Sequence, residues 1–266
     1  MSFGRFIYSL LTFATLIAPV AVFAGPISAY YLTYGDGQKV YMVQGNSLVN
    51  TINTNPATNH PYPIAVADTV RTFTYRGQVF GSEYQLDGTP TGNTYYNPEF
   101  LSLTDGTTDG VNFNYAIQWS TGAVYRYDRA WANGSVLFTV ARDFGGITFD
   151  SMTGTLWVNN RVNGETRNYD LSGNLLSSFF ANSNVGWSLA YEEASDSLWY
   201  WGDNDSRLYN YSKSGSLIES VAIAGVSGNI LGGEFAITGR ATVPVAGSLA
   251  LIVLGLVGLG WHRRSS

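Results

Sequence analysis

An internal repeat is the sequence feature that most restricts what this chain can fold into. Ile147-Thr-Phe149 matches Leu189-Ala-Tyr191, and Thr155-Leu-Trp157 matches Ser197-Leu-Trp199, both at the same offset along the chain. Internal repeats of about 40 to 45 residues are typical of the blades of β-propellers, each of which is a four-stranded sheet. The offset falls in this range, so the chain is expected to be built from repeated four-stranded units.

A tyrosine followed by a glycine turn marks each unit. The spacings between successive tyrosines are 43, 43, 42 and 42, and with their glycines they are Tyr41 and Gly45, Tyr84 and Gly88, Tyr127 and Gly134, Tyr169 and Gly173, and Tyr211 and Gly215. We expect a strand that ends in a hairpin, where glycine supplies a positive φ, and then an apolar outer strand. The third unit is the least regular, and its inner strand is ambiguous between Phe100 to Leu103 and Val111 to Phe113.

The first unit lacks an inner strand of its own. In the clearest units that strand lies about 20 residues before the tyrosine, and the same distance before Tyr41 falls within the N-terminal apolar segment. A surplus strand, Ile230 to Ile237, follows the last unit. We expect it to complete the first blade and close an all-β propeller of about five blades, which removes open sheet edges. An open β-sandwich or an irregular stack is the alternative for the same hairpins.

Composition agrees with an all-β chain that is stabilised by packing. Aromatic residues make up 15% of the sequence, and there are 30 glycines, which suits many short strands joined by tight turns. There is no cysteine, so neither a disulfide nor a thiolate nucleophile can form.

The N-terminus has the pattern of a signal peptide. Arg5 precedes an apolar run from Phe6 to Val22, and Val22-Phe-Ala24 places small residues at −3 and −1. We expect residues 1–24 to be removed by signal peptidase between Ala24 and Gly25, which leaves residues 25–240 as the folded body. An uncleaved membrane anchor is the alternative, and in either case the body is exported.

The C-terminal residues 241–266 have the pattern of a membrane anchor. Val245 to Trp261 carries no charge, and Arg263 and Arg264 follow at once. A spanning helix needs roughly 17 to 25 apolar residues, and positively charged residues stay in the cytoplasm. We therefore expect a transmembrane helix over 245–261 with the body on the far side, the alternative being a buried core helix.

This tail resembles a PEP-CTERM sorting signal. The resemblance rests on Val243-Pro244-Val245-Ala246, the Gly/Leu-rich apolar run after it, and the closing Arg263-Arg264. It implies processing by an exosortase-type membrane protease, and a protein that is first held in the inner membrane and then moves to the envelope, the surface or the medium. The chain departs from the family at Val245, where Glu is usual, and at Ala246, where a second Pro is usual.

The sequence offers little catalytic chemistry. Its two histidines, His60 and His262, are too few for a zinc site or a histidine-dependent triad in the body. A charged fraction of 12% and a net charge of −5 argue against a nucleic-acid partner, because there is no basic patch to neutralise a run of phosphates. Glu83, Glu192 and Glu193 are the carboxylates considered for glycoside cleavage. Glu192 and Glu193 are expected in a solvated turn, so the chain is not expected to be an enzyme.

Ligand binding has weak sequence signals. The loop Gly202 to Ser206 contains Asp203 and Asp205, which could hold Ca²⁺, but it lacks a later bidentate Glu, so a polar hairpin turn is the favoured interpretation. The aromatic residues that could form a stacking platform for sugars are Trp157, Trp187, Trp199, Tyr200 and Trp201. Trp157 and Trp199 occupy equivalent repeat positions and are expected in the core. Because Tyr200 and Trp201 point to opposite faces of a strand, one is expected to be exposed, and Trp201, Asp203 and Asp205 are the candidate ligand residues.

Three functions remain open at this stage. The first is a structural or interaction module of the cell surface or extracellular matrix, which contacts polysaccharide or surface proteins and needs no cofactor. The second is a carbohydrate-binding propeller, which predicts an aromatic cluster with Asp or Asn on one ring face. The third is a propeller lyase or hydrolase, which requires two carboxylates that converge in the central channel.

Overall fold

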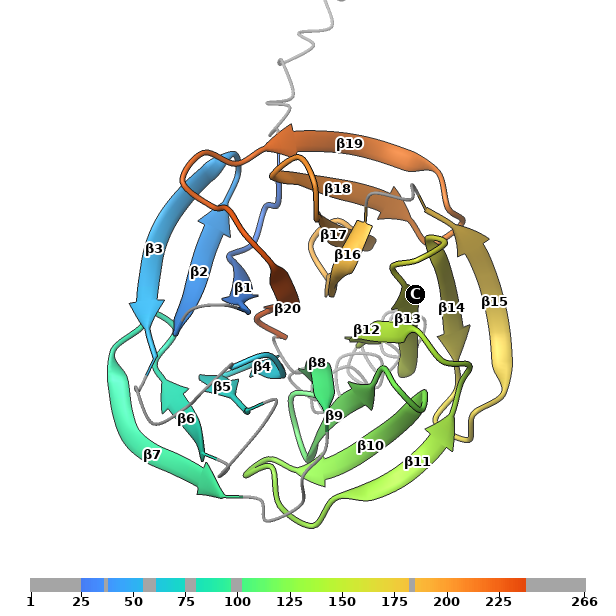
Figure 1. Ribbon diagram of the computed structural model, residues 1–266, viewed down its shortest axis with the longest axis horizontal. Helices are drawn as coiled ribbons and strands as arrows, with labels where there is room; N and C mark the ends of the chain where they lie inside the picture. Colours follow the sequence, from blue (N-terminus) through green and yellow to red (C-terminus); the bar gives the residue numbers. More distant parts are fainter. Residues whose placement is uncertain are drawn as a thin grey trace, which may run out of the picture.

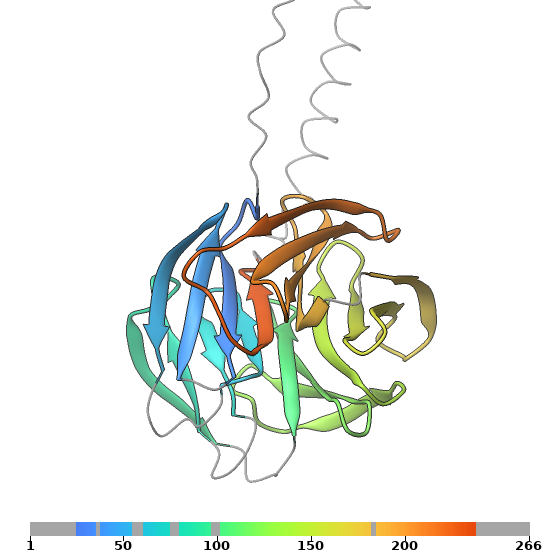
Figure 2. The same cartoon turned by 45° about the horizontal axis from the view of Figure 1, so that its top comes forward.

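The protein is a five-bladed β-propeller in the part of the chain that the structure describes. The computed structural model describes residues 25–35, 38–54, 61–74, 80–96, 102–181 and 185–237, which contain five four-stranded antiparallel sheets. The sheets are arranged radially around one axis (Figure 1), and Figure 2 shows the blades from a tilted direction. The propeller prediction is confirmed, and the open sandwich is excluded.

Both predicted targeting segments lie outside these residues. The signal peptide 1–24 and the sorting motif with its spanning segment 245–261 belong to the ranges that the structure does not describe. Within the described ranges no helix has the length and apolar character to span a membrane.

Each blade runs from an inner strand at the axis to an outer strand at the rim. Blade 1 contains β20 (Ile230–Phe235), β1 (Tyr30–Tyr34), β2 (Lys39–Gln44) and β3 (Ser47–Asn53), and blade 2 contains β4 (Ile64–Val66), β5 (Val70–Thr72), β6 (Phe80–Tyr84) and β7 (Pro90–Tyr96). Blade 3 contains β8 (Leu103–Thr108), β9 (Phe113–Gln118), β10 (Ala123–Asp128) and β11 (Ser135–Thr139). Blade 4 contains β12 (Phe144–Asp150), β13 (Thr155–Asn160), β14 (Glu165–Tyr169) and β15 (Leu175–Phe180). Blade 5 contains β16 (Val185–Glu192), β17 (Ser197–Gly202), β18 (Arg207–Ser212) and β19 (Leu217–Ala222).

The C-terminal strand of the body closes the ring, as the sequence predicts. Strand β20 pairs antiparallel with β1, with Tyr30 opposite Phe235. The aromatic rings of Tyr30 and Phe235 stack with their centroids 4.5 Å apart, and both side chains are buried. Blade 1 is thus made from both ends of the body, and its inner edge is supplied by a strand from the far end of the described chain.

The inner strand of blade 3 overlaps the first of the two segments that the sequence suggests at Leu103 only, and it continues beyond that segment. It is β8, Leu103–Thr108, with the sequence LTDGTT. All six residues are buried although only one is a large apolar residue. A search for apolar runs misses this strand because its polar side chains form hydrogen bonds at the propeller axis.

The five repeat tyrosines hold equivalent places in the fold. Each lies in the third strand of its blade and is at most 8% exposed. Four of the hairpin glycines have the expected positive φ, namely Gly45, Gly88, Gly173 and Gly215. In blade 3 the positive φ falls on Asn133 instead, and a Cβ on Gly134 would stand 2.4 Å from the ring of Tyr127. Glycine at 134 is therefore required by close packing rather than by its backbone angle.

One carboxylate at the axis connects four of the five blades. Asp105 is fully buried, and its Oδ1 accepts hydrogen bonds from the backbone N–H groups of Gly106 at 2.8 Å and Gly233 at 3.0 Å. Its Oδ2 accepts from the N–H groups of Ile147 at 3.1 Å and Leu189 at 3.3 Å. Burial raises the pKa of Asp105 well above that of an ordinary aspartate, and the four N–H groups oppose this shift. Blades 1, 3, 4 and 5 therefore share a single acceptor group.

Further side-chain oxygens satisfy other N–H groups around the axis. Thr107 Oγ1 accepts from the Phe149 N–H at 3.0 Å, and Thr148 Oγ1 accepts from the Tyr191 N–H at 2.9 Å. Thr148 also donates to the buried Glu234 carboxylate at 3.3 Å. Blade 1 also packs closely on the segment before β4, because a Cβ on Gly232 would lie 2.0 Å from the carbonyl oxygen of Tyr62.

The Asp105→Asn variant tests the axial carboxylate. An amide keeps one acceptor oxygen but turns an NH₂ group toward backbone donors, so we expect the free energy of unfolding to fall by about 3 kcal/mol. Urea denaturation measures this loss. The control is Asp109→Asn, in a half-buried turn where Oδ1 accepts from the N–H groups of residues 111 to 113, and it should cost less than about 1.5 kcal/mol. Equal losses at the two positions would contradict a special role for Asp105.

Candidate functional site

The strongest candidate site is a hollow where the inner strands begin. Two adjoining cavities lie there, and we call them together the mouth. One, of about 260 Å³, is lined by Tyr62, Thr104, Trp119, Arg161, Trp187, Asn229 and Leu231. The other, of about 540 Å³, is lined by Arg161, Asp203, Asn204, Gly228 and Asn229. Every blade contributes to the first cavity, since these residues come from β20, β8, β16, the segment before β4, and the turns after β9 and β13.

Two tryptophans and an arginine form the aromatic part of the mouth. The rings of Trp119 and Trp187 are 5.7 Å apart between centroids and tilted by 34°. Both side chains are half-buried. The Arg161 guanidinium lies over the Trp187 ring at 4.3 Å from its centroid, which is the geometry of a cation–π contact.

The polar part of the mouth centres on Asp203. Its Oδ2 is 3.8 Å from Arg161 Nη1, whereas its buried Oδ1 has no hydrogen-bond partner among the described residues. The buried indole Nε1 of Trp187 also has none within that part of the chain. Burial raises the pKa of Asp203, and the charge of Arg161 opposes that shift. One acceptor and one donor at the mouth are therefore unused by the described part of the protein.

The repeat explains how these side chains come together. Trp119, Arg161 and Asp203 follow one another at intervals of one repeat length, and each comes just after the second strand of its blade. Equivalent turns of neighbouring blades lie on one face of a propeller, so the three side chains converge although their chemistry differs. Gly145 is the counterpart of Trp187 one repeat earlier, and a Cβ there would lie 2.7 Å from the Trp187 ring. Sequence reasoning missed Trp119 and Arg161, and their shared repeat position is the signal that could have found them.

The predicted ligand residues divide into one that reaches the mouth and two that do not. Asp203 lines the mouth. Trp201 is 1% exposed and packs in the hydrophobic core between blades 5 and 1, so its prediction as a ligand residue is wrong. Tyr200 is fully buried as well, because both faces of β17 are covered by neighbouring blades. Asp205 accepts a hydrogen bond from the Tyr209 hydroxyl and does not line either cavity.

The calcium hypothesis gains no support from the loop geometry. Asp203 faces Arg161, while Asp205 is engaged by Tyr209. Across the described ranges, no group of three or more His, Cys, Asp or Glu side chains could hold a metal ion.

The carboxylates of the predicted solvated turn are in fact structural. Glu192 is fully buried and accepts hydrogen bonds from Trp199 Nε1 at 3.0 Å and from the Ser28 N–H at 2.7 Å. Glu193 accepts from the Ser151 hydroxyl. The prediction of a solvated turn at Glu192 is thus wrong, since its side chain anchors the indole of Trp199 in the next strand.

The core prediction for the two repeat tryptophans is confirmed. Trp157 is 2% exposed and Trp199 is 1% exposed. Their indoles also have equivalent partners, because Asp150, one repeat before Glu192, is fully buried and lies 3.5 Å from Trp157 Nε1.

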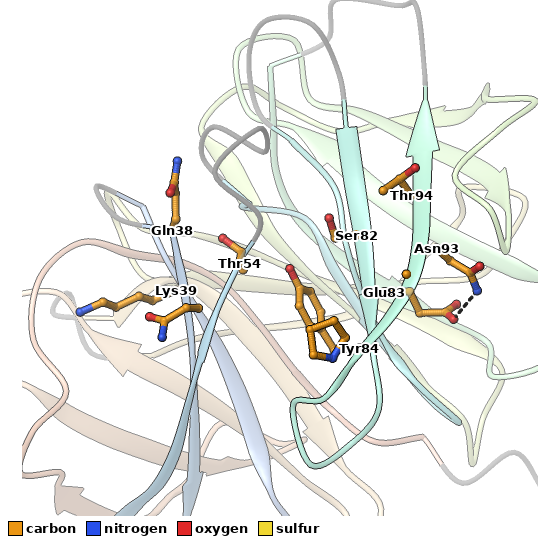
Figure 3. Close-up of a pocket in the computed structure, with 11 residues that line it drawn as sticks. Gln38, Lys39, Thr54, Ser82, Glu83, Tyr84, Asn93 and Thr94 are labelled. Atoms are coloured by element: carbon orange, nitrogen blue, oxygen red, sulfur yellow. Dashed lines mark hydrogen bonds between the residues drawn. The ribbon is translucent and has the colours of Figure 1, made fainter.

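A second concavity lies between blades 1 and 2 (Figure 3). This groove of about 660 Å³ is lined by residues of β2, β3, β6 and β7, among them Glu83, Tyr84 and Asn93. Glu83 is already occupied, because it accepts hydrogen bonds from Asn93 Nδ2 at 2.9 Å, Arg71 Nε at 2.8 Å and the Tyr95 hydroxyl. The groove is therefore a weaker candidate than the mouth.

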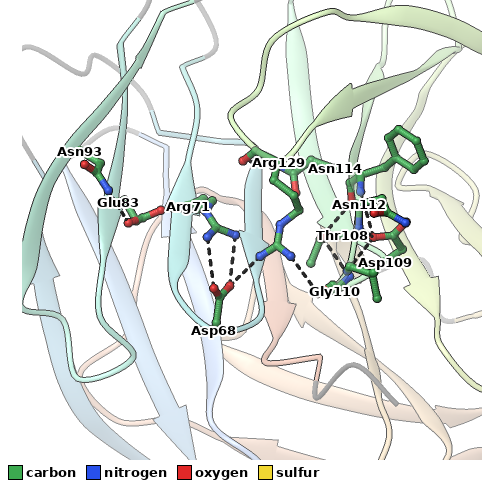
Figure 4. A network of polar contacts seen from close by, with 12 residues as sticks. Asp68, Arg71, Glu83, Asn93, Thr108, Asp109, Gly110, Asn112, Asn114 and Arg129 are labelled. Carbon is green, nitrogen blue, oxygen red and sulfur yellow. Dashed lines mark hydrogen bonds and ion pairs between the residues drawn. The ribbon is translucent and has the colours of Figure 1, made fainter. Parts of the chain in front are cut away.

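An ion-pair network connects Glu83 to blade 3 (Figure 4). Arg71 also contacts Asp68 at 3.3 Å, and Arg129 Nη2 reaches the same carboxylate at 2.6 Å. Arg129 Nη1 donates to the Gly110 carbonyl at 2.8 Å. Asp68 and Gly110 lie in the turns between first and second strands, on the face opposite the mouth. On this face, ion pairs between described side chains thus connect blade 2 to blade 3.

Two carboxylates do lie at the axis, as the third functional hypothesis requires. They are Asp105 and Glu234, and both are fully buried. Asp105 accepts hydrogen bonds from four backbone N–H groups. Glu234 accepts hydrogen bonds from the Thr148 hydroxyl and from the N–H group of its neighbour Phe235. Neither lines either cavity of the mouth.

Comparison with known proteins supports the fold. No protein-family model matches the chain, and no curated protein matches it. The chain is similar to one in the crystal structure of a nidogen/laminin complex, with a TM-score of 0.56 and 12% identity over 79% of this chain and 99% of the other. It is also similar to virginiamycin B lyase from Staphylococcus aureus, with a TM-score of 0.47 and 15% identity over 73% of this chain and 66% of that one. The first likeness shows the propeller fold alone.

The Glu83→Gln variant tests the network by its pH dependence. Burial alone would raise the pKa of Glu83, but hydrogen bonds from Tyr95, Asn93 and Arg71 outweigh burial and lower the pKa to about 2. A lowered folded pKa stabilises the protein above the ordinary value of 4.5, and this contribution is lost as the pH falls toward 2. We expect the variant to be less stable than the parent by about 2 to 3 kcal/mol at pH 7, with a smaller difference at pH 3.

Chemical denaturation at the two pH values measures both differences. The control is Glu165→Gln, which removes a partly exposed ion pair with Arg167 and should cost less than about 1 kcal/mol at either pH. A Glu83→Gln difference that does not shrink at pH 3 would contradict the predicted linkage.

Proposed function

We propose that the protein is an exported interaction module of the cell envelope that binds a neutral glycan at the mouth. The observation that carries this proposal is the Trp119–Trp187 pair, with Arg161 and Asp203 beside it, on one face of the ring. The carbohydrate-binding hypothesis asked for such an aromatic cluster next to an Asp.

The chemistry of the mouth suits a sugar. Aromatic faces bury the apolar C–H surface of a pyranose ring, and a few polar groups then orient its hydroxyls. The Asp203 carboxylate lines the mouth 3.8 Å from Arg161, and this polar pair can orient a bound hydroxyl. The exposed Asn229 at the junction of the two cavities adds an amide that both donates and accepts.

Charge favours a neutral ligand over an anionic one. Among the described residues that line the mouth, the one cation is Arg161, and it lies 3.8 Å from Asp203, so the pair presents little net charge. The whole chain has a net charge of −5, which repels polyanions at long range. Binding rather than cleavage is proposed because the axial carboxylates Asp105 and Glu234 are sealed by their own hydrogen bonds.

Export and sorting complete the proposal. They are supported by the signal-peptide pattern that ends at Ala24 and by the PEP-CTERM-like tail from Val243 to Arg264. A body that carries a glycan-binding face and is held by such a tail would act at the outer envelope or in the matrix, after processing by an exosortase-type protease.

Replacement of Trp187 by alanine tests glycan binding. Titration calorimetry with cellohexaose and chitohexaose as probes should show binding to the parent, and Trp187→Ala should weaken it by about fivefold or more, because stacking contributes roughly 1 kcal/mol or more. The matched control is Phe180→Ala, which removes an aromatic side chain that is 67% exposed on the outer strand β15. Affinity that is unchanged in Trp187→Ala, or no binding of either oligosaccharide by the parent, would rule out this site for these sugars.

Processing of the tail is tested in a host with and without its exosortase-type protease. We expect the intact mass to show loss of the segment that follows the Val243-Pro244 motif only when the protease is present, together with movement of the body from the inner membrane to the surface or medium. A chain that stays uncleaved in the inner membrane in both hosts would overturn the sorting proposal and leave a single-pass anchor.

A further inference from the structure

The first residues of the body connect blade 5 to blade 1, at the place where the ring closes. We call this junction, with the β1–β20 pair beside it, the seam. Gly25 N–H donates to Glu219 Oε2 of β19 at 3.0 Å, and Ser28 N–H donates to Glu192 Oε1 of β16 at 2.7 Å. Both acceptors belong to blade 5, whereas the segment leads directly into β1 of blade 1. The segment therefore connects the last blade to the first, beside the β1–β20 pair.

Gly25 is built into the folded body. It is buried, its φ is 99°, and a Cβ at this position would lie 2.1 Å from the Gly45 carbonyl oxygen. Pro26 is held as well, because its carbonyl oxygen accepts from the Gly45 N–H at 2.9 Å. Residue 25 has to be glycine here on both steric and conformational grounds.

We propose that Gly25 is the first residue of the processed protein and that its new α-ammonium group forms an ion pair with Glu219 that clamps the seam. Water adds across the Ala24–Gly25 peptide bond, so that Ala24 leaves with a carboxylate and Gly25 keeps an amine that takes up a proton. The Gly25 nitrogen, which contacts Glu219 as a neutral amide N–H, then contacts it as a charged ammonium group. This inference rests on the export part of the proposed function and is independent of glycan binding.

The charge change strengthens an existing contact. Hydrogen bonds between ionised groups are shorter and roughly twice as strong as neutral ones. Glu219 is half-buried on the outer strand, and its carboxylate contacts the Gly25 nitrogen directly. Because Gly25 is buried in the folded body, the peptidase must cut before this segment takes its place in the ring.

The experiment compares the chain that begins at Gly25 with the chain that begins at Ala24, both purified in mild detergent. The second chain keeps the Gly25 N–H donor but moves the charge away by one residue. We expect the Gly25 chain to melt about 2 to 4 °C higher, and Glu219→Gln to remove that advantage. Glu165→Gln, whose carboxylate pairs with Arg167, should shift both chains equally.

The pH dependence distinguishes an ion pair from simple packing. A pairing carboxylate raises the folded pKa of the amine, so the stabilisation is complete below the ordinary amine pKa of about 8 and is lost as the pH rises through the folded value. The difference between the chains should therefore shrink from pH 6 to pH 10. Equal melting temperatures at pH 6, or a Glu219→Gln effect of the same size in both chains, would overturn the proposal.

Mass spectrometry of the exported protein identifies its first residue directly. A mature chain that starts at Gly25 supports the inference, and any other first residue overturns it. Neither result depends on the Trp187 measurement, so failure of the clamp and failure of glycan binding are separate outcomes.

Discussion

The Asp105 carboxylate is the interaction on which the ring depends. The innermost strand of each blade has one edge that faces the axis and has no neighbouring strand to pair with. Backbone N–H groups on that edge are buried, and leaving a buried N–H group without an acceptor destabilises the fold. Asp105 accepts four of them, from Gly106, Ile147, Leu189 and Gly233, and thereby gives blades 1, 3, 4 and 5 a shared acceptor. Thr107 and Thr148 do the same for single N–H groups farther along the axis. The polar centre thus joins four of the five sheets at the axis.

Positions where one repeat differs from the next supply the side chains that join the blades at the axis and form the mouth. Asp105 stands where the next two repeats have Ile147 and Leu189, and it is the residue that binds their backbones. Trp119, Arg161 and Asp203 likewise share one repeat position but differ in chemistry. Since equivalent positions of neighbouring blades lie side by side around an axis, such variation gathers unlike side chains in one place. The aromatic, cationic and acidic groups of the mouth are gathered in this way.

Closure of the ring and assembly of the candidate site involve the same strand. Strand β20 pairs with β1, and its Gly233 N–H donates a hydrogen bond to Asp105. The same strand places Leu231 at the mouth. The N-terminal segment secures the other side of the same seam through Glu192 and Glu219. A change that loosens the seam is therefore expected to disturb the mouth as well, because Asn229 and Leu231 belong to both.

The sequence by itself determined the repeat length, the all-β class, the five blades and the closing strand, because packing of one blade on the next imposes the same apolar and turn pattern on each unit. It also placed Trp157 and Trp199 in the core. It did not show that β8 is a strand, that Glu192 is buried or that Trp201 is inaccessible, since each depends on what neighbouring blades cover. Only the tertiary structure decided which side chains meet at the axis and at the mouth, because these contacts join residues one or more repeats apart and depend on the geometry of the closed ring.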